Sequence, residues 1–202
     1  MKHTIHGIAR LLTPLVALAL MTASADAQVT KPFKITGSGI APEGLPLPGQ
    51  APRPHDIEGQ ATHLGNHTGL GSVQTDTAEF DPSIGDFGGF VGEFGSGEPF
   101  VFVAANGDEL ACHYGRTDKG ATVPGVFELT IVGIADGGAP IVEAFFIAEF
   151  VPQPESTGRF AGASGGWIMF ARTKPFVLGS SEPLEYSWEG AGKLTFQKPA
   201  AD

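Results

Sequence analysis

The chain has 202 residues, a formal net charge of −10 and a single cysteine. Its length suits one domain with a substantial core. The acidic balance repels phosphate backbones, and no basic patch offsets it, which argues against nucleic-acid binding. Because Cys112 has no second cysteine to pair with, a fold held by intrachain disulfides is excluded.

The N-terminal 27 residues have the three parts of a cleaved secretory signal peptide. Lys2 and Arg10 supply positive charge, residues 11–21 form an apolar run, and Ala25-Asp26-Ala27 is a small-x-small cleavage pattern. The apolar run is too short to span a hydrocarbon core of about 30 Å. We therefore expect cleavage after Ala27 and a secreted or periplasmic protein without stable membrane insertion.

Residues 28–56 are rich in proline and glycine, most densely between Ala41 and Pro54. Proline fixes φ and removes a hydrogen-bond donor, so this composition predicts an extended arm or linker before the folded domain. We expect the domain itself at residues 57–197 and a short C-terminal tail at residues 198–202.

From Ile57 onward the chain shows repeated β-strand patterns and no amphipathic helix. About eight strands are predicted, at residues 57–74, 79–94, 100–104, 109–116, 126–134, 141–151, 160–172 and 184–196. Asp81-Pro82 and Gly85-Asp86 are turn-like interruptions within the second of these. The turns between them are fairly regular, and many of the 29 glycines fall inside the strand patterns, where glycine marks bulges and tight bends. This predicts an all-β domain, with an antiparallel barrel favoured over a sandwich because closure removes exposed edges.

Three segments show the clearest local patterns. Asn106-Gly107 is the favoured pair for a type I′ hairpin turn. Residues 126–134 place Phe127, Leu129 and Ile131 on one face, as strict alternation requires. Residues 141–151 alternate in the same way, which predicts one inward face for each strand.

Three glycine-rich phrases carry a family resemblance. They are Gly59-Gln60-Ala61-Thr62-His63-Leu64-Gly65, Ala104-Ala105-Asn106-Gly107-Asp108-Glu109-Leu110 and Gly158-Arg159-Phe160-Ala161-Gly162-Ala163-Ser164-Gly165. With the strand order, they resemble exported bacterial proteins related to the allene oxide cyclase and dirigent barrels. The resemblance implies a single eight-stranded antiparallel β-barrel of calycin type and assembly as a homotrimer.

Several residues could carry chemistry. His63 and His67, joined by His113, would bind a metal only if their strand bulged at Gly65, because positions i and i+4 of a strand lie about 13 Å apart. Cys112 and His113 are neighbours that point to opposite faces of a strand, and Cys112 alternates with Leu110 and Tyr114, which predicts an inward, inert thiol. No cofactor or metal site is predicted.

The aromatic residues supply most of the apolar volume, which either fills the barrel or lines a pocket for one small ligand. Glutamates on apolar strands, Glu109 among them, point outward by alternation or offer carboxylates for acid–base chemistry. The candidate pocket residues are His63, His67, Glu109, His113, Tyr114, Trp167, Tyr186 and Trp188.

Two hypotheses follow for function. The first is an exported, non-enzymatic barrel that binds a small apolar ligand or serves as a structural or envelope module. The alternative is an isomerase, cyclase or dirigent-like enzyme that acts on a hydrophobic substrate inside the barrel. An enzyme requires convergent polar groups at an apolar cavity, whereas a structural barrel is filled by side chains.

Overall fold

The computed structural model describes residues 28–197. The predicted signal peptide and C-terminal tail lie outside the described residues. Between residues 28 and 197 the structure is all-β, as predicted, with twelve strands and two short 3₁₀ helices. No helix in this part of the chain has the length and apolar character of a membrane span.

The elements follow one another along the chain with short connections. In order they are β1 (Gln28–Ala41), β2 (Arg53–Ala61), β3 (Gly65–Thr75), β4 (Glu79–Asp81), β5 (Gly89–Ser96), β6 (Phe100–Ala104), β7 (Glu109–Tyr114), η1 (Thr117–Lys119), β8 (Gly125–Ile134), β9 (Pro140–Pro152), η2 (Gly158–Phe160), β10 (Ser164–Thr173), β11 (Phe176–Val177) and β12 (Leu184–Gln197).

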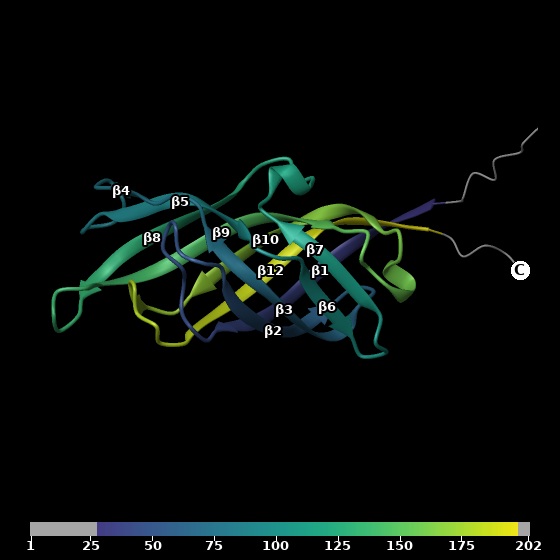
Figure 1. Ribbon diagram of the computed structural model, residues 1–202, viewed down its shortest axis with the longest axis horizontal. Coiled ribbons are helices and arrows are strands. Elements are labelled where there is room, and N and C mark those ends of the chain that lie inside the picture. Colours follow the sequence, from purple (N-terminus) through teal and green to yellow (C-terminus); the bar gives the residue numbers. More distant parts are fainter. Residues whose placement is uncertain (1–27, 198–202) are drawn as a thin grey trace, which may run out of the picture.

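Eight of the strands form a ring within one sheet (Figure 1). The order is β10-β12-β1-β2-β3-β6-β7-β9, and β9 returns to pair with β10; every neighbouring pair is antiparallel. Two pairs of strands connect β3 to β9. In one part of these strands β6 pairs with β3 and β7 with β9; in another part β5 pairs with β3 and β8 with β9. The ring therefore has no open edge between β3 and β9 at either end.

The prediction of an extended arm at residues 28–56 is wrong for its first half. Residues 28–41 form β1, which pairs over its whole length with β12 and over six residues with β2. Phe33 and Ile35 face the core and are fully buried. The alternation was hidden because the next two inward positions are Gly37 and Gly39, residues that are depleted in strands. Of residues 28–56, only residues 42–52 lie outside a strand, because residues 53–56 already belong to β2.

One of the eight predicted strands is divided. Residues 57–74 fold into the β2–β3 hairpin around a turn at residues 62–64, where His63 has a positive φ of 72°. The interruption predicted within residues 79–94 is confirmed, since β4 ends at Asp81 and β5 begins at Gly89. The strand predicted at residues 160–172 starts only at Ser164, because residues 158–160 form η2.

The hairpin around Asn106-Gly107 forms with a different turn from the one predicted. Ala104 N donates to Asp108 O at 2.9 Å, and of the intervening residues only Gly107 has a positive φ, of 85°. A type I′ turn needs two such residues, whereas a three-residue loop that ends in a left-handed glycine needs one. The face assignments in β8 and β9 are confirmed, since Phe127, Leu129 and Ile131 are buried and alternate inward residues of β9 are buried too.

Large aromatic side chains fill most of the interior. Trp167 stacks on Phe150 with ring centroids 5.1 Å apart, and Phe150 stacks on Tyr114 at 4.8 Å. Each such ring, fully buried, contributes about 1.5–3 kcal/mol by removing apolar surface from water. Cys112 is completely buried within this core and His113 faces outward, as the alternation predicts.

Inward-facing glycines draw one wall of the ring close to these aromatic side chains. Gly37 and Gly59 are directly paired on β1 and β2, and a Cβ on Gly37 would lie 2.2 Å from Glu58 O and 2.8 Å from the Trp188 ring. A Cβ on Gly59 would lie 2.2 Å from Thr36 O. The β1–β2 part of the ring therefore lies close to the interior side chains, and the outer surface above it is concave.

Candidate functional site

A chain of three polar side chains lies inside the ring. His55 on β2, Tyr114 at the end of β7 and Tyr186 on β12 all occupy inward positions of their strands. His55 Nδ1 lies 2.6 Å from the Tyr186 hydroxyl, and His55 Nε2 lies 3.1 Å from the Tyr114 hydroxyl. The Tyr114 hydroxyl donates to the carbonyl of Ser72 at 3.1 Å.

The carbonyl of Ser72 sets the direction of every hydrogen bond among these three side chains. A carbonyl only accepts, so the single Tyr114 proton is committed to it, and the Tyr114 oxygen must accept from His55 Nε2–H. The neutral imidazole then presents Nδ1 as an acceptor, which takes the Tyr186 proton. The Tyr186 oxygen keeps its own lone pairs free. The order of donation is thus Tyr186 to His55 to Tyr114 to Ser72.

Burial keeps all three groups uncharged at neutral pH. It lowers the pKa of His55 from 6.5 to about 4, because the imidazolium would lose its hydration. Burial likewise raises the pKa of Tyr186, with a smaller contribution from the charge of Asp56. It raises the pKa of Tyr114 well above its usual value. Neutral groups with committed protons are consistent with the donation order given above.

The chain of polar groups borders a small cavity of about 50 Å³ whose surface is otherwise mostly apolar. The cavity lining includes Leu45, Phe94, Phe146 and Met169. A second cavity of about 120 Å³ lies on the other side of Leu45 and Phe146, beneath Pro46, Leu47 and Pro48. Residues 42–52 therefore cover one end of the interior, and their Leu45 side chain takes part in separating the two cavities.

Arg53 holds this covering segment in place. Its guanidinium donates to the carbonyl oxygens of Glu43 and Leu45, the second at 3.1 Å, and to the Gln50 side chain at 3.1 Å. Leu47 N donates to the same Gln50 side chain at 2.9 Å. These contacts lie within the segment and at the start of β2, and Pro46 is buried beneath them.

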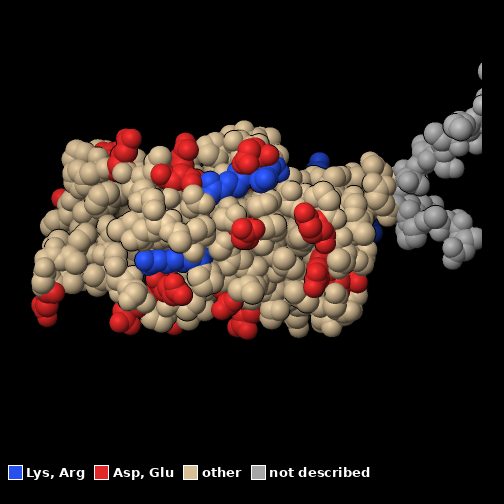
Figure 2. Space-filling view, viewed as in Figure 1, with Lys and Arg blue, Asp and Glu red and all other residues tan. Residues whose placement is uncertain are grey.

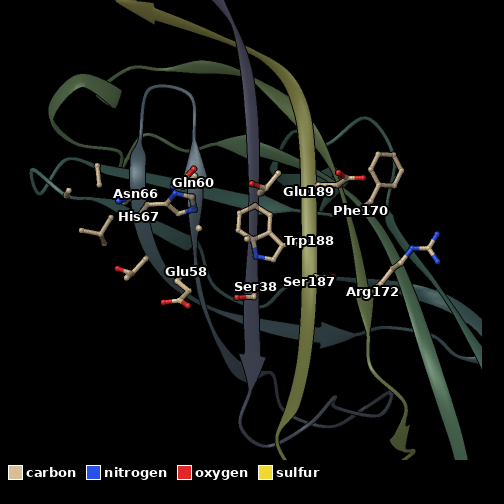
Figure 3. A pocket seen from close by; sticks show the side chains of 17 residues that line it. Ser38, Glu58, Gln60, Asn66, His67, Phe170, Arg172, Ser187, Trp188 and Glu189 are labelled. Atoms are coloured by element: carbon tan, nitrogen blue, oxygen red, sulfur yellow. The ribbon is translucent and has the colours of Figure 1, made fainter.

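The outer surface carries an open groove of about 1110 Å³ across β10, β12, β1, β2 and β3. Figure 3 shows the side chains on both sides of β1, with Glu58, Gln60, Asn66 and His67 from the β2–β3 hairpin on one side. On the other side lie Ser187 and Glu189 from β12 and Phe170 and Arg172 from β10, and the Trp188 ring overlaps β1 in this view. The groove lies over the paired glycines Gly37 and Gly59, where the wall sinks.

The candidate pocket residues from the sequence fall into separate places. Tyr114 and Tyr186 meet through His55, whereas His67 and Trp188 meet beneath the groove, inside the ring of strands, with ring centroids 6.0 Å apart. Trp167 is part of the aromatic core. The remaining three do not join either place: His63 packs on Phe196, Glu109 lies on β7 beside Thr157, and His113 hydrogen-bonds Ser96 on the outer face.

The structure does not bring His63, His67 and His113 together. Among residues 28–197, no group of three histidine, cysteine, aspartate or glutamate side chains lies close enough to hold a metal ion. His63 sits in the hairpin turn, so the proposed bulge at Gly65 never aligns it with His67. Figure 2 shows acidic side chains scattered over one face, with few basic ones among them.

Sequence reasoning missed His55 and the polar groove. His55 follows the proline-rich stretch, which we expected to be an arm, although its alternation with Ile57 on β2 would have placed it inside. In comparisons with protein-family models, with curated proteins and with solved structures, no match to this chain was found.

Proposed function

We propose that this chain is an exported β-barrel protein of the allene oxide cyclase-like type that binds a small apolar ligand inside the barrel, beneath residues 42–52. The observation that carries the proposal is the Tyr186 hydroxyl at an otherwise apolar cavity, with its proton committed to His55 and its lone pairs unused. An apolar enclosure with one polar anchor is the usual composition of a small-ligand site.

The donation order defines the polar group of the ligand. Because Tyr186 gives its proton to His55, its oxygen is left as an acceptor beside the cavity. A ligand hydroxyl or N–H group would satisfy that oxygen, whereas a ketone or ether would not. We therefore propose an apolar molecule with one hydrogen-bond donor.

Binding requires the covering segment to move. Ligand pockets usually enclose about 300–1,000 Å³, far more than the 50 Å³ beside Tyr186. Withdrawal of the Leu45 side chain would join this cavity with the one of about 120 Å³ beneath Pro46 and Leu47. The Arg53 contacts that hold residues 42–52 would then limit the rate of entry.

The test uses the fluorescent probe N-phenyl-1-naphthylamine, an apolar molecule with one N–H group, displaced by n-alkanols and by n-alkanes of equal length. The purified protein is expected to prefer alkanols, and Tyr186→Phe to lose that preference. Leu45→Trp, which fills the space between the cavities, should abolish binding. Exposed Phe87→Leu is the control and should bind like the original protein. Absence of probe binding, or an unchanged preference in Tyr186→Phe, would favour a structural or envelope module instead.

A second function, isomerase or cyclase chemistry on a hydrophobic substrate, is favoured by the continuity of the Tyr186–His55–Tyr114 chain. A substrate proton that reaches the Tyr186 oxygen could displace the Tyr186 proton to His55 Nδ1, and the reverse transfer would return a proton to the substrate. If native mass spectrometry identifies a co-purifying ligand, turnover of its chemical class should fall in His55→Asn. Recovery of the ligand chemically unchanged after incubation with the original protein would leave binding as the function.

A further inference from the structure

We infer that the outer groove binds a neutral, polyhydroxylated chain such as an oligosaccharide. This site is separate from the interior pocket and faces solvent on the outside of the ring. Its polar side chains are arranged in rows that the sheet register makes continuous, and they are exposed.

Two adjacent rows of outward side chains cross the groove. In one, Phe170, Glu189, Thr36, Gln60 and Asn66 are successive cross-strand partners from β10 to β3. In the next, the partners are Arg172, Ser187, Ser38, Glu58 and Thr68. Strands are about 4.8 Å apart, so each row presents a hydrogen-bonding group at that spacing across four strands.

The polar side chains in these rows are available to a ligand. In the part of the chain that the structure describes, none of the hydroxyl, amide and carboxylate groups in the two rows forms a side-chain hydrogen bond or an ion pair. Hydroxyls and amides both donate and accept, and carboxylates accept. That mixture matches sugar hydroxyl groups, which also donate and accept.

An aromatic ring lies at the edge of the groove. Phe170 is 40% exposed and stacks on Phe145 at a centroid distance of 6.1 Å and an interplanar angle of 12°. The Arg172 guanidinium lies 4.6 Å from the centroid of the same Phe145 ring. Phe170 thus packs on a neighbour and stays 40% exposed, which leaves apolar surface for packing against a sugar ring.

Charge selects against acidic polymers. Glu58 and Glu189 line the groove with Arg172 as the basic group, and the adjoining hollow adds Asp56 and Glu185 against Lys174. This excess of carboxylates would repel polyuronates and nucleic acids. The ligand class is therefore a neutral glycan.

The experiment screens the purified protein on an array of neutral and acidic oligosaccharides and measures each hit by calorimetry. Neutral oligosaccharides should bind, and Gln60→Ala and Asn66→Ala should each weaken binding about three- to tenfold, the value of one hydrogen bond. Glu58→Gln should also weaken it, whereas Glu128→Gln, an outward glutamate on β8, should not.

Tyr186→Phe separates this site from the interior pocket, because it should leave oligosaccharide binding unchanged while altering alkanol preference. The inference is overturned if no neutral oligosaccharide binds at millimolar concentration. It is also overturned if only acidic oligosaccharides bind, or if Gln60→Ala and Glu58→Gln bind as tightly as Glu128→Gln.

Discussion

The Tyr186 hydroxyl lies 2.6 Å from His55 Nδ1, although 131 residues separate the two along the chain. The contact crosses β1, the strand that lies between β2 and β12, and it is made where β1 contributes Gly39. A Cβ on Gly39 would lie 2.4 Å from the Tyr186 oxygen, so the glycine makes room for this hydrogen bond. The interior polar chain and the sunken wall are therefore parts of one arrangement.

Removal of the Tyr186 hydroxyl should destabilise the protein even without a ligand. In Tyr186→Phe, His55 Nδ1 becomes an unpaired acceptor in an apolar enclosure, which costs about 1–3 kcal/mol. The double variant His55→Phe/Tyr186→Phe has no unpaired imidazole nitrogen and should recover part of the lost free energy of unfolding. Urea unfolding of the three proteins measures this. Equal stability of Tyr186→Phe and the original protein would contradict the described hydrogen bond.

The lowered pKa of His55 predicts that stability falls on mild acidification. Unfolded His55 takes up a proton near pH 6.5, whereas folded His55 does so only near pH 4, so the unfolded state binds more protons between these values. The free energy of unfolding should therefore decrease as pH falls from 6.5 to 4, by on the order of 2–3 kcal/mol from this group, and change little further below pH 4.

Denaturant unfolding at closely spaced pH values tests this dependence. The double variant His55→Phe/Tyr186→Phe should show a shallower slope over the same range. Some slope should remain, because burial also lowers the pKa of His67 and of His113. A slope identical to that of the original protein would mean that folding does not lower the pKa of His55.

The sequence predicted those strands whose two faces differ in hydropathy. In β8 and β9, apolar residues such as Phe127 and Phe146 alternate with Glu128 and Glu143, and the structure has those strands and faces. In β1 the inward positions after Ile35 are glycines, so hydropathy carries no alternation there. The strand forms because β2 and β12 pair with it on both sides, which is tertiary information.

The candidate site was only half predictable for a related reason. Tyr114 and Tyr186 were chosen as inward polar residues of recognisable strands, and the structure joins them. Their link, His55, lies directly after Pro54 at the end of a proline-rich stretch. Neither the pairing of β2 with β1 nor the outer rows of polar side chains can be derived without the sheet register, because alternation alone does not say which strands are neighbours.

The native thiol of Cys112 should be unreactive. It is fully buried in the aromatic core, and burial raises the pKa of the thiol well above its usual value, so the nucleophilic thiolate is scarce. Labelling with 5,5′-dithiobis(2-nitrobenzoate) should be negligible in buffer and reach one thiol per chain in guanidinium chloride. Because Cys112 is the only cysteine, the signal reports this site alone. Rapid labelling in buffer would place the thiol outside the core.

The paired glycines beneath the groove should tolerate no side chain. Gly37→Ala places a methyl group 2.2 Å from the backbone oxygen of Glu58, and the backbone there cannot shift without disturbing its pairing with Gly59. We expect a loss of at least about 2–3 kcal/mol in the free energy of unfolding, as for other overpacked sites.

Gly133→Ala on β8 is the matched control for this substitution. A Cβ on Gly133 would meet only Ile141, at 3.8 Å, which is ordinary contact, and its φ is not in the left-handed region. Because alanine restricts the unfolded chain more than glycine does, Gly133→Ala should be neutral or stabilising by about 0.4–1 kcal/mol. Urea unfolding of both variants compares them directly. If Gly37→Ala were as stable as Gly133→Ala, the wall of the ring would not lie against Trp188 as described, and the groove above it would be shallower.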